Sequence, residues 1–307
     1  MDTTGESHAT TATTTIVSRP EKFVGNNESA HTARRSSWNL WATQIASILR
    51  LEATRNFLSS RSMLIYLLAA MPLLLLLMIA IIPPNVRDWG SLADTKNAFA
   101  VFYEALILRT VIFFGCAWIF MNLIRGEVVD RSLHYYFLAP VRREIFIVGK
   151  YLAGVLVSTA FFVTMTLFAI LLAHLPHHAT ASLNDFTNGN GAAQMFAYLG
   201  TTLLACIGYG AVFLLIGLYF RNPVIPALLL YGWEWLNFLL PPVLKKISVI
   251  HYMHSLVPVP VGAGPFEVLA APTPAYISIP GLLIFVGVVL YLAARRTRRM
   301  EILYGGE

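Results

Sequence analysis

Three ionisable residues interrupt long apolar stretches of the sequence: Glu104 and Arg109 in one stretch and Glu234 in another. A charged side chain in the middle of a bilayer costs roughly 2.5–3.5 kcal/mol on insertion scales, so it normally faces protein or water. Glu234 either lines a transport path or pairs with Arg109, and we favour a buried ion pair for Arg109. Glu104 and Arg109 are five residues apart, about 140° around an α-helix, which predicts that they are poor partners for each other.

Histidine is the second residue type here that could do chemistry. The histidines that we expect on the outer side are His174, His177, His178, His251 and His254. A His-x-x-His pair on a helix can bind a metal, but no carboxylate or cysteine completes a ligand set at a useful spacing. We therefore interpret them as loop side chains and predict no metal site.

The sequence lacks a phosphate-binding loop and two common hydrolase motifs. The Gly149-Lys150 pair has Glu144 where a phosphate-binding loop needs its first glycine, and Tyr151 where it needs Ser or Thr. Neither H-E-x-x-H nor G-x-S-x-G occurs. We predict that the chain is not an enzyme and holds no cofactor of its own.

A short polar segment between two apolar stretches, residues 125–150, is the most informative part of the chain. Leu133, Tyr136 and Phe137 share one helical face, and Pro140 ends that short helix. Such a helix could insert into a groove on a soluble partner. It could equally be an interfacial loop whose arginines extend towards water, and the residues alone leave both readings open.

The elements that carry these residues follow from the composition. Of 307 residues, 57% are hydrophobic and 12% are charged, and the mean hydropathy is +0.64. Soluble domains carry about 25% charged residues, so an ordinary cytosolic protein is excluded and a polytopic membrane protein is indicated. Cys116 and Cys206 both lie in apolar runs and form no disulfide framework.

We predict an all-α polytopic membrane protein with six transmembrane helices, since about 20 apolar residues cross a bilayer core. Residues 1–37 are predicted to be a disordered cytoplasmic tail, and residues 38–307 the transmembrane domain. An apolar stripe that starts at Trp38 and Trp41 predicts an interfacial amphipathic helix before the first span. The Pro-rich segment 241–274 is expected to dip back into the outer leaflet as short helices. The predicted spans are 63–82, 98–124, 151–173, 195–220, 224–240 and 275–294.

Positive charges near the span ends set the orientation. With a cytoplasmic N-terminus, the cytoplasmic side holds thirteen: Arg50, Arg55, Arg61, Arg125, Arg131, Arg142, Arg143, Lys150, Arg221, Arg295, Arg296, Arg298 and Arg299. The outer side holds four: Arg87, Lys96, Lys245 and Lys246. We therefore expect both termini in the cytoplasm and the chain in the plasma (inner) membrane.

The segment Glu127 to Lys150 has acidic residues, a short amphipathic helix, Leu-Ala-Pro-Val-Arg-Arg and a Gly-Lys pair that opens the next span. In this order of features it resembles the permease subunits of ABC-2 type exporters. The six-span plan fits the same family, although Arg-Ser-Leu-His at 131–134 replaces its usual Gly-Thr-Leu-Glu. The resemblance implies a coupling helix that contacts a separate ATPase, which binds the ATP and Mg²⁺. The coupling residues that it implies are Glu127, Asp130, Leu133, Tyr136, Phe137, Pro140, Arg142 and Arg143.

We therefore expect the membrane-spanning subunit of an ATP-driven exporter, working as a homodimer or heterodimer of permeases with two ATPase subunits and binding no nucleic acid. Two alternatives stay open. One is an ion-coupled secondary transporter that uses Glu234 and Glu104, and the other is a membrane enzyme that acts on lipids through the outer histidines.

Overall fold

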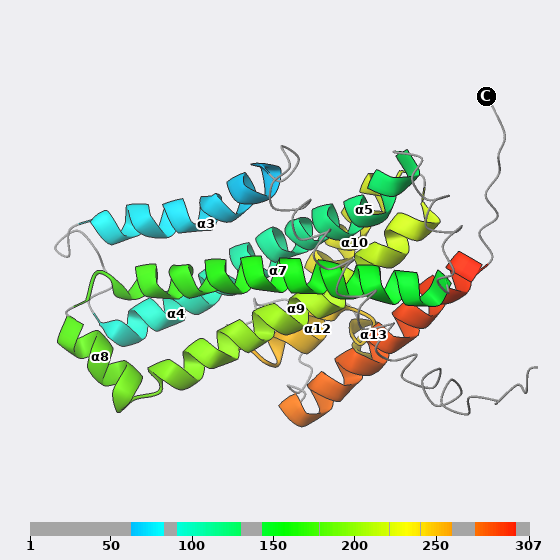
Figure 1. The fold of residues 1–307 in the computed structure, drawn as a ribbon. Helices are drawn as coiled ribbons and strands as arrows, with labels where there is room; N and C mark the ends of the chain where they lie inside the picture. The colour runs from blue at the N-terminus through cyan, green and yellow to red at the C-terminus, as the bar shows by residue number, and fades with distance from the viewer. Residues whose placement is uncertain are drawn as a thin grey trace, which may run out of the picture. The chain divides into compact units, whose positions relative to one another are not determined.

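The computed structural model describes residues 63–82, 91–129, 143–177, 179–220, 222–239, 241–259 and 274–298, and these residues form helices and turns without a strand. The predicted all-helical class is confirmed for them. The predicted tail 1–37 and the interfacial helix from Trp38 lie outside the described residues. The elements are α3 (Met63–Ile81), α4 (Leu92–Phe102), η3 (Tyr103–Ile112), α5 (Phe113–Val129), α7 (Arg143–His174), α8 (Ala179–Thr187), α9 (Gly191–Tyr219), α10 (Val224–Trp235), η4 (Leu236–Leu239), α11 (Pro242–Lys245), α12 (Val249–His254) and α13 (Ala275–Arg298) (Figure 1).

Five helical stretches of the described chain are long and apolar enough to cross a membrane: Met63–Ile81, Leu92–Leu123, Phe146–His174, Gly191–Tyr219 and Ala275–Thr297. They coincide with five of the six predicted spans and indicate a membrane-embedded protein. The remaining predicted span, 224–240, is not one continuous helix. Its α10 has 12 residues and is therefore about 18 Å long, too short for a core of about 30 Å. It passes into the 3₁₀ turn η4 just before Pro241.

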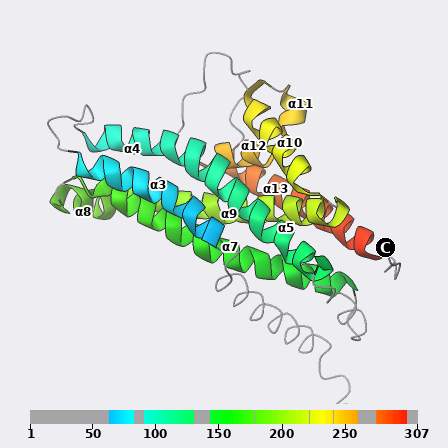
Figure 2. The same ribbon diagram turned by 90° about the horizontal axis from the view of Figure 1, so that it is seen from above.

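Side-chain contacts give the directions of the central helices. Phe162 of α7 packs on Gly115, near the start of α5, and Phe120, further along α5, packs on Gly154, nearer the start of α7. The two helices therefore run antiparallel, and the end of α5 lies near the start of α7 (Figure 2). The segment 130–142, which contains most of the predicted coupling residues, joins these two ends.

Helices α9 and α13 run in the same direction. Leu282 of α13 lies beside Gly208 of α9, and further along both helices Arg296 stacks on Tyr219, 5.0 Å from its ring centroid. The chain between them must therefore run back along the bundle. Its described part does so in the short pieces α10, η4, α11 and α12 rather than in a full-length helix.

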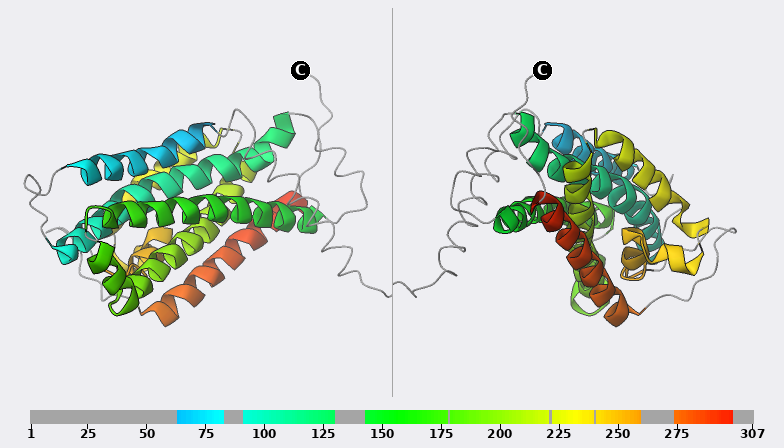
Figure 3. Two further views of the ribbon diagram at one scale, coloured as in Figure 1. Left: turned by 60° about the vertical axis from the view of Figure 1, so that its left-hand side comes forward. Right: turned by 90° about the vertical axis from the view of Figure 1, so that its right-hand side faces the viewer.

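Helices α3 and α13 are the least covered of the five membrane-length stretches. Only 22% of the apolar window of α3 and 28% of that of α13 are buried, against 61% for Leu92–Leu123. Both pack on α7, which runs between them (Figure 3). The exposed apolar side chains of these two helices fit a hydrocarbon environment, where the hydrophobic effect does not penalise them.

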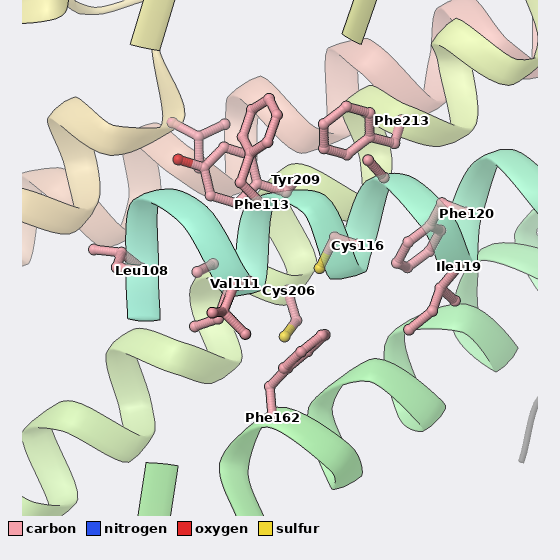
Figure 4. Close-up of a cluster of buried hydrophobic side chains, with 14 of the residues drawn as sticks. Leu108, Val111, Phe113, Cys116, Ile119, Phe120, Phe162, Cys206, Tyr209 and Phe213 are labelled. Carbon is pink, nitrogen blue, oxygen red and sulfur yellow. The ribbon is translucent and has the colours of Figure 1, made fainter. Parts of the chain in front are cut away.

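An aromatic core joins α5, α7 and α9. The ring of Phe113 lies 5.3 Å from that of Tyr209 and 4.9 Å from that of Phe213, measured between centroids, in edge-to-face geometry (Figure 4). Phe120 fills the space beside Gly210, where a β-carbon would collide with its ring. Small residues at such points allow close helix packing, so the three helices form one unit that positions the charged residues.

Candidate functional site

The charged pair Glu104 and Arg109 lies on η3, a π-helix within the second membrane-length stretch. Arg109 Nη2 donates a hydrogen bond to Glu104 Oε1 at 2.9 Å. The prediction that these two residues are poor partners is therefore wrong. It assumed α-helical geometry, whereas a π-helix bonds residue i to residue i+5 and places side chains five apart on one face. Thr110 repeats the same i, i+5 relation by donating to the carbonyl oxygen of Ala105 at 3.2 Å.

His254 of α12 joins this pair from a distant part of the chain. Its Nδ1 lies 3.1 Å from Glu104 Oε1, the same oxygen that accepts from Arg109. The side chain of Glu104 is 8% exposed, that of Arg109 17% and that of His254 39%. Among the described residues Glu104 Oε2 has no hydrogen-bond partner. We call Glu104, Arg109 and His254 the central polar cluster.

Trp235, at the end of α10, covers the guanidinium of Arg109. The Arg109 Cζ atom lies 5.7 Å from the ring centroid of Trp235, within the range of a cation–π interaction. The Tyr231 hydroxyl, one turn earlier, lies 3.3 Å from Thr110 Oγ1. Helix α10 therefore borders the central polar cluster with aromatic side chains, whereas the members of the cluster come from η3 and α12.

Glu234 does not form the predicted ion pair with Arg109. Its carboxylate accepts hydrogen bonds from the Ser248 hydroxyl at 2.7 Å and from the backbone N–H groups of Val249 and Ile250, both at 3.1 Å. The residue is 3% exposed. A buried carboxylate needs such donors, and three of them are supplied where α12 begins. Glu234 thus attaches α12 to α10.

A second polar group lies along α9, beside the central polar cluster. The Tyr103 hydroxyl donates to the carbonyl oxygen of Tyr198 at 3.1 Å and lies 2.9 Å from Thr202 Oγ1. Thr166 of α7 is 3.2 Å from the same Thr202 hydroxyl. These bonds join η3, α7 and α9, and they satisfy hydroxyl groups that would be costly to bury alone.

The outer histidines are divided between two places. His174 Nδ1 bonds the carbonyl oxygen of Ile170 at 2.8 Å, and His177 Nε2 lies 2.8 Å from Thr95 Oγ1. His254 belongs to the central polar cluster, which corrects its interpretation as a loop side chain. His178 lies outside the described residues. Within the described ranges no three His, Cys, Asp or Glu side chains come close enough to hold a metal ion.

Sequence reasoning missed the contact of His254 with Glu104. The two residues are 150 positions apart, and nothing in the spacing near either one indicates the other. Their contact depends on the folding of α12 against η3 and α9, which only the tertiary structure shows.

The predicted coupling residues fall at the end of α5, at the start of α7 and on the segment between these helices. Glu127 lies on α5, and Arg143 is the first residue of α7, but the structure describes neither side chain. The other members lie outside the described residues: Asp130, Leu133, Tyr136, Phe137, Pro140 and Arg142. Their roles stay predictions.

Lys150 ties together the two helices that border this segment. It is 1% exposed, and its Nζ donates to the carbonyl oxygen of Leu123 on α5 at 3.2 Å. The same Nζ lies 5.5 Å from the ring centroid of Phe146. The Lys150 side chain therefore joins α7 to α5, close to the ends that residues 130–142 connect.

In the comparisons with known proteins, no protein-family model matches the chain and no curated protein matches it significantly.

Proposed function

We propose that this chain is the membrane-spanning permease subunit of an ATP-driven exporter of the ABC-2 type. A separate ATPase would bind ATP and Mg²⁺ and contact the loop 125–150. The observation that carries the proposal is the extension of α7 beyond a bilayer. Its 32 residues span about 48 Å, against a hydrocarbon core of about 30 Å, so the segment 130–142 can stand clear of the membrane, where a soluble partner reaches it.

The contacts of the bundle supply a route for force from that loop. A push on residues 130–142 would move α5 and α7 together, because Lys150 joins them through the Leu123 carbonyl. Helix α5 continues directly into η3, so the movement would reach Glu104 and, through it, His254 on α12. The ATPase does work only if it binds two states of the permease with different affinities.

The partial exposure of the central polar cluster favours a second permease copy or an aqueous path beside η3. The side chains of Arg109 and His254 are 17% and 39% exposed, although Arg109 lies in the middle of a membrane-length stretch. Exposure of such groups to lipid is costly. In our proposal a second permease, like or unlike this chain, covers this face, and the transport path runs beside it.

The orientation can be tested by labelling introduced cysteines. Both natural cysteines, Cys116 and Cys206, are 0% exposed, so their background labelling is low. An Arg142→Cys variant should react with an impermeant maleimide only after the cells are opened. A Leu183→Cys variant, on α8 at the opposite end and 62% exposed in the natural chain, should react in intact cells. The reverse pattern would overturn the proposal.

The proposal predicts that a soluble ATPase is encoded beside this chain, and coupling can be tested with that ATPase. The double variant Tyr136→Ala with Arg142→Glu should abolish co-purification of the ATPase and ATP-driven export. Leu183→Ala is the matched control, since it also removes an apolar side chain but from the opposite end. If the double variant keeps both association and export, the loop 125–150 is not the coupling element.

An ion-coupled secondary transporter is the second candidate. It is favoured by the buried Glu104, which has one carboxylate oxygen without a partner among the described residues and contacts the titratable His254. Transport that continues without any ATPase, and stops when the ion gradient is dissipated, would select this function instead.

A further inference from the structure

Two adjoining pockets lie where α3 ends and α4 begins. One has about 420 Å³ of empty space and is lined by α3, α4 and α7; the other has about 350 Å³ and is lined by α4, α7 and α9. Thr95, Phe99 and Ala173 line both of them, so the two pockets adjoin at these residues. Both volumes include space that is open to the surroundings.

The two pockets differ in chemistry. The first, which we call the apolar pocket, includes Leu76 and Ile79 of α3, Ala98 and Phe102 of α4, and Leu172 of α7. Only 22% of the apolar window of α3 is buried, so much of the helix that lines this pocket suits a hydrocarbon environment. Its apolar lining fits a flexible alkyl chain.

The second, which we call the polar pocket, is lined by Lys96, His174, Gln194 and Tyr198. Lys96 Nζ bonds Asp185 Oδ1 at 2.6 Å, so this pair contributes no net charge. The polar pocket therefore offers hydrogen-bonding groups to a ligand without a strong preference for an anion or a cation.

Three buried polar atoms at the polar pocket have no hydrogen-bond partner in the described part of the chain: the Tyr198 hydroxyl, His174 Nε2 and Asp185 Oδ2. Asp185 Oδ2 lies against Gly191, which also lines the pocket. Tyr198 is 4% exposed, so water at the surface of the protein does not hydrate it freely. A buried polar group left unpaired costs about 1–3 kcal/mol, so each such group is expected to have a partner, which is either water or a bound ligand.

We propose that the two pockets together bind one membrane amphiphile from the adjoining leaflet. Its alkyl chain occupies the apolar pocket, and its head, which carries hydrogen-bond donors and acceptors but no net charge, occupies the polar pocket. The head bonds the Tyr198 hydroxyl and His174 Nε2. This site does not depend on ATP-driven export or on the orientation of the chain, because it follows from the pockets and from the three unpaired atoms.

The test uses the full chain in nanodiscs of phosphatidylcholine that contain a monoacylglycerol with an alkyl diazirine in its acyl chain, because the glycerol head has hydroxyl groups and no charge. After illumination, mass spectrometry maps the labelled residues. Labelling at Ile79 and Phe102 should saturate as the mole fraction of the probe rises. Labelling at Leu74, which is 58% exposed on α3 and lines neither pocket, should rise in proportion to that fraction.

Two variants examine the two pockets separately. Ala98→Trp fills the apolar pocket and should lower labelling at Ile79 and Phe102 at least tenfold, with Leu74 unchanged. Tyr198→Phe removes the unpaired hydroxyl and should lower the same labelling severalfold. Because that hydroxyl has no partner in the described protein, the melting temperature of Tyr198→Phe should not fall, which separates loss of ligand from loss of fold.

Three outcomes would overturn the proposal. Labelling that rises linearly with the probe and ignores both variants would mean contact with bulk lipid only. Labelling that responds to Ala98→Trp but not to Tyr198→Phe would mean that water alone fills the polar pocket. Crosslinks at Ile79 to a second copy of the chain, in place of lipid, would assign the apolar pocket to a protein interface.

Discussion

Arg109 donates a hydrogen bond to Glu104, five residues earlier in the chain, and His254 contacts the same carboxylate oxygen. The π-helix makes the first contact possible, and α12 brings the second from 150 positions away. One carboxylate thus holds together two parts of the bundle.

Replacing Glu104 with Gln should destabilise the protein by about 2–3 kcal/mol, because Arg109 would stay largely buried without its counter-charge. Thermal unfolding in detergent measures the change. The double variant Glu104→Gln with Arg109→Met removes both charges and should recover much of the loss. Equal stability of the single variant and the natural protein would show that the pair contributes little.

Gly210→Ala should destabilise the protein by about 1–3 kcal/mol, because the added methyl group would collide with the Phe120 ring. Gly200→Ala on the same helix is the control. A β-carbon there meets nothing within 4 Å, and alanine in a helix is favoured over glycine by about 0.5–1 kcal/mol. Phe120→Leu should partly rescue Gly210→Ala but not improve the natural protein. Equal melting temperatures for the two glycine variants would contradict the packing of Phe120.

Glu234→Gln should loosen α12, because the neutral side chain accepts more weakly from Ser248 and the two backbone amides; hydrogen bonds to a charged group contribute about 1.5–3 kcal/mol. Amide hydrogen exchange at Val249 and Ile250 should speed up at least tenfold. The control Ser255→Ala removes a hydrogen bond to Ser278 at the other end of α12, so the exchange rates of the Val249 and Ile250 amides should not change. Unchanged exchange in Glu234→Gln would show that the carboxylate does not hold α12.

Lys150→Met should uncouple α5 from α7 if force passes through both helices, as we propose. The ATPase should still associate, but ATP-driven export should fall severalfold, since the bond to the Leu123 carbonyl is lost. Leu152→Ala, at an exposed position of the same helix, should not change export. Loss of association together with export would instead place Lys150 in the ATPase contact.

The sequence by itself determined the class of the protein and five membrane-length helices, because long uncharged apolar stretches in a bilayer have no alternative to helix. It did not determine how 224–240 folds, since a short apolar stretch before Pro241 is compatible with a span or with short helices. Composition also cannot predict a π-helix, which depends on packing, so the Glu104–Arg109 pair was missed. The contacts of His254 with Glu104 and of Glu234 with the start of α12 join residues far apart in the chain. Only the tertiary structure decided them, because a buried charge takes whichever partner the folded bundle brings within reach.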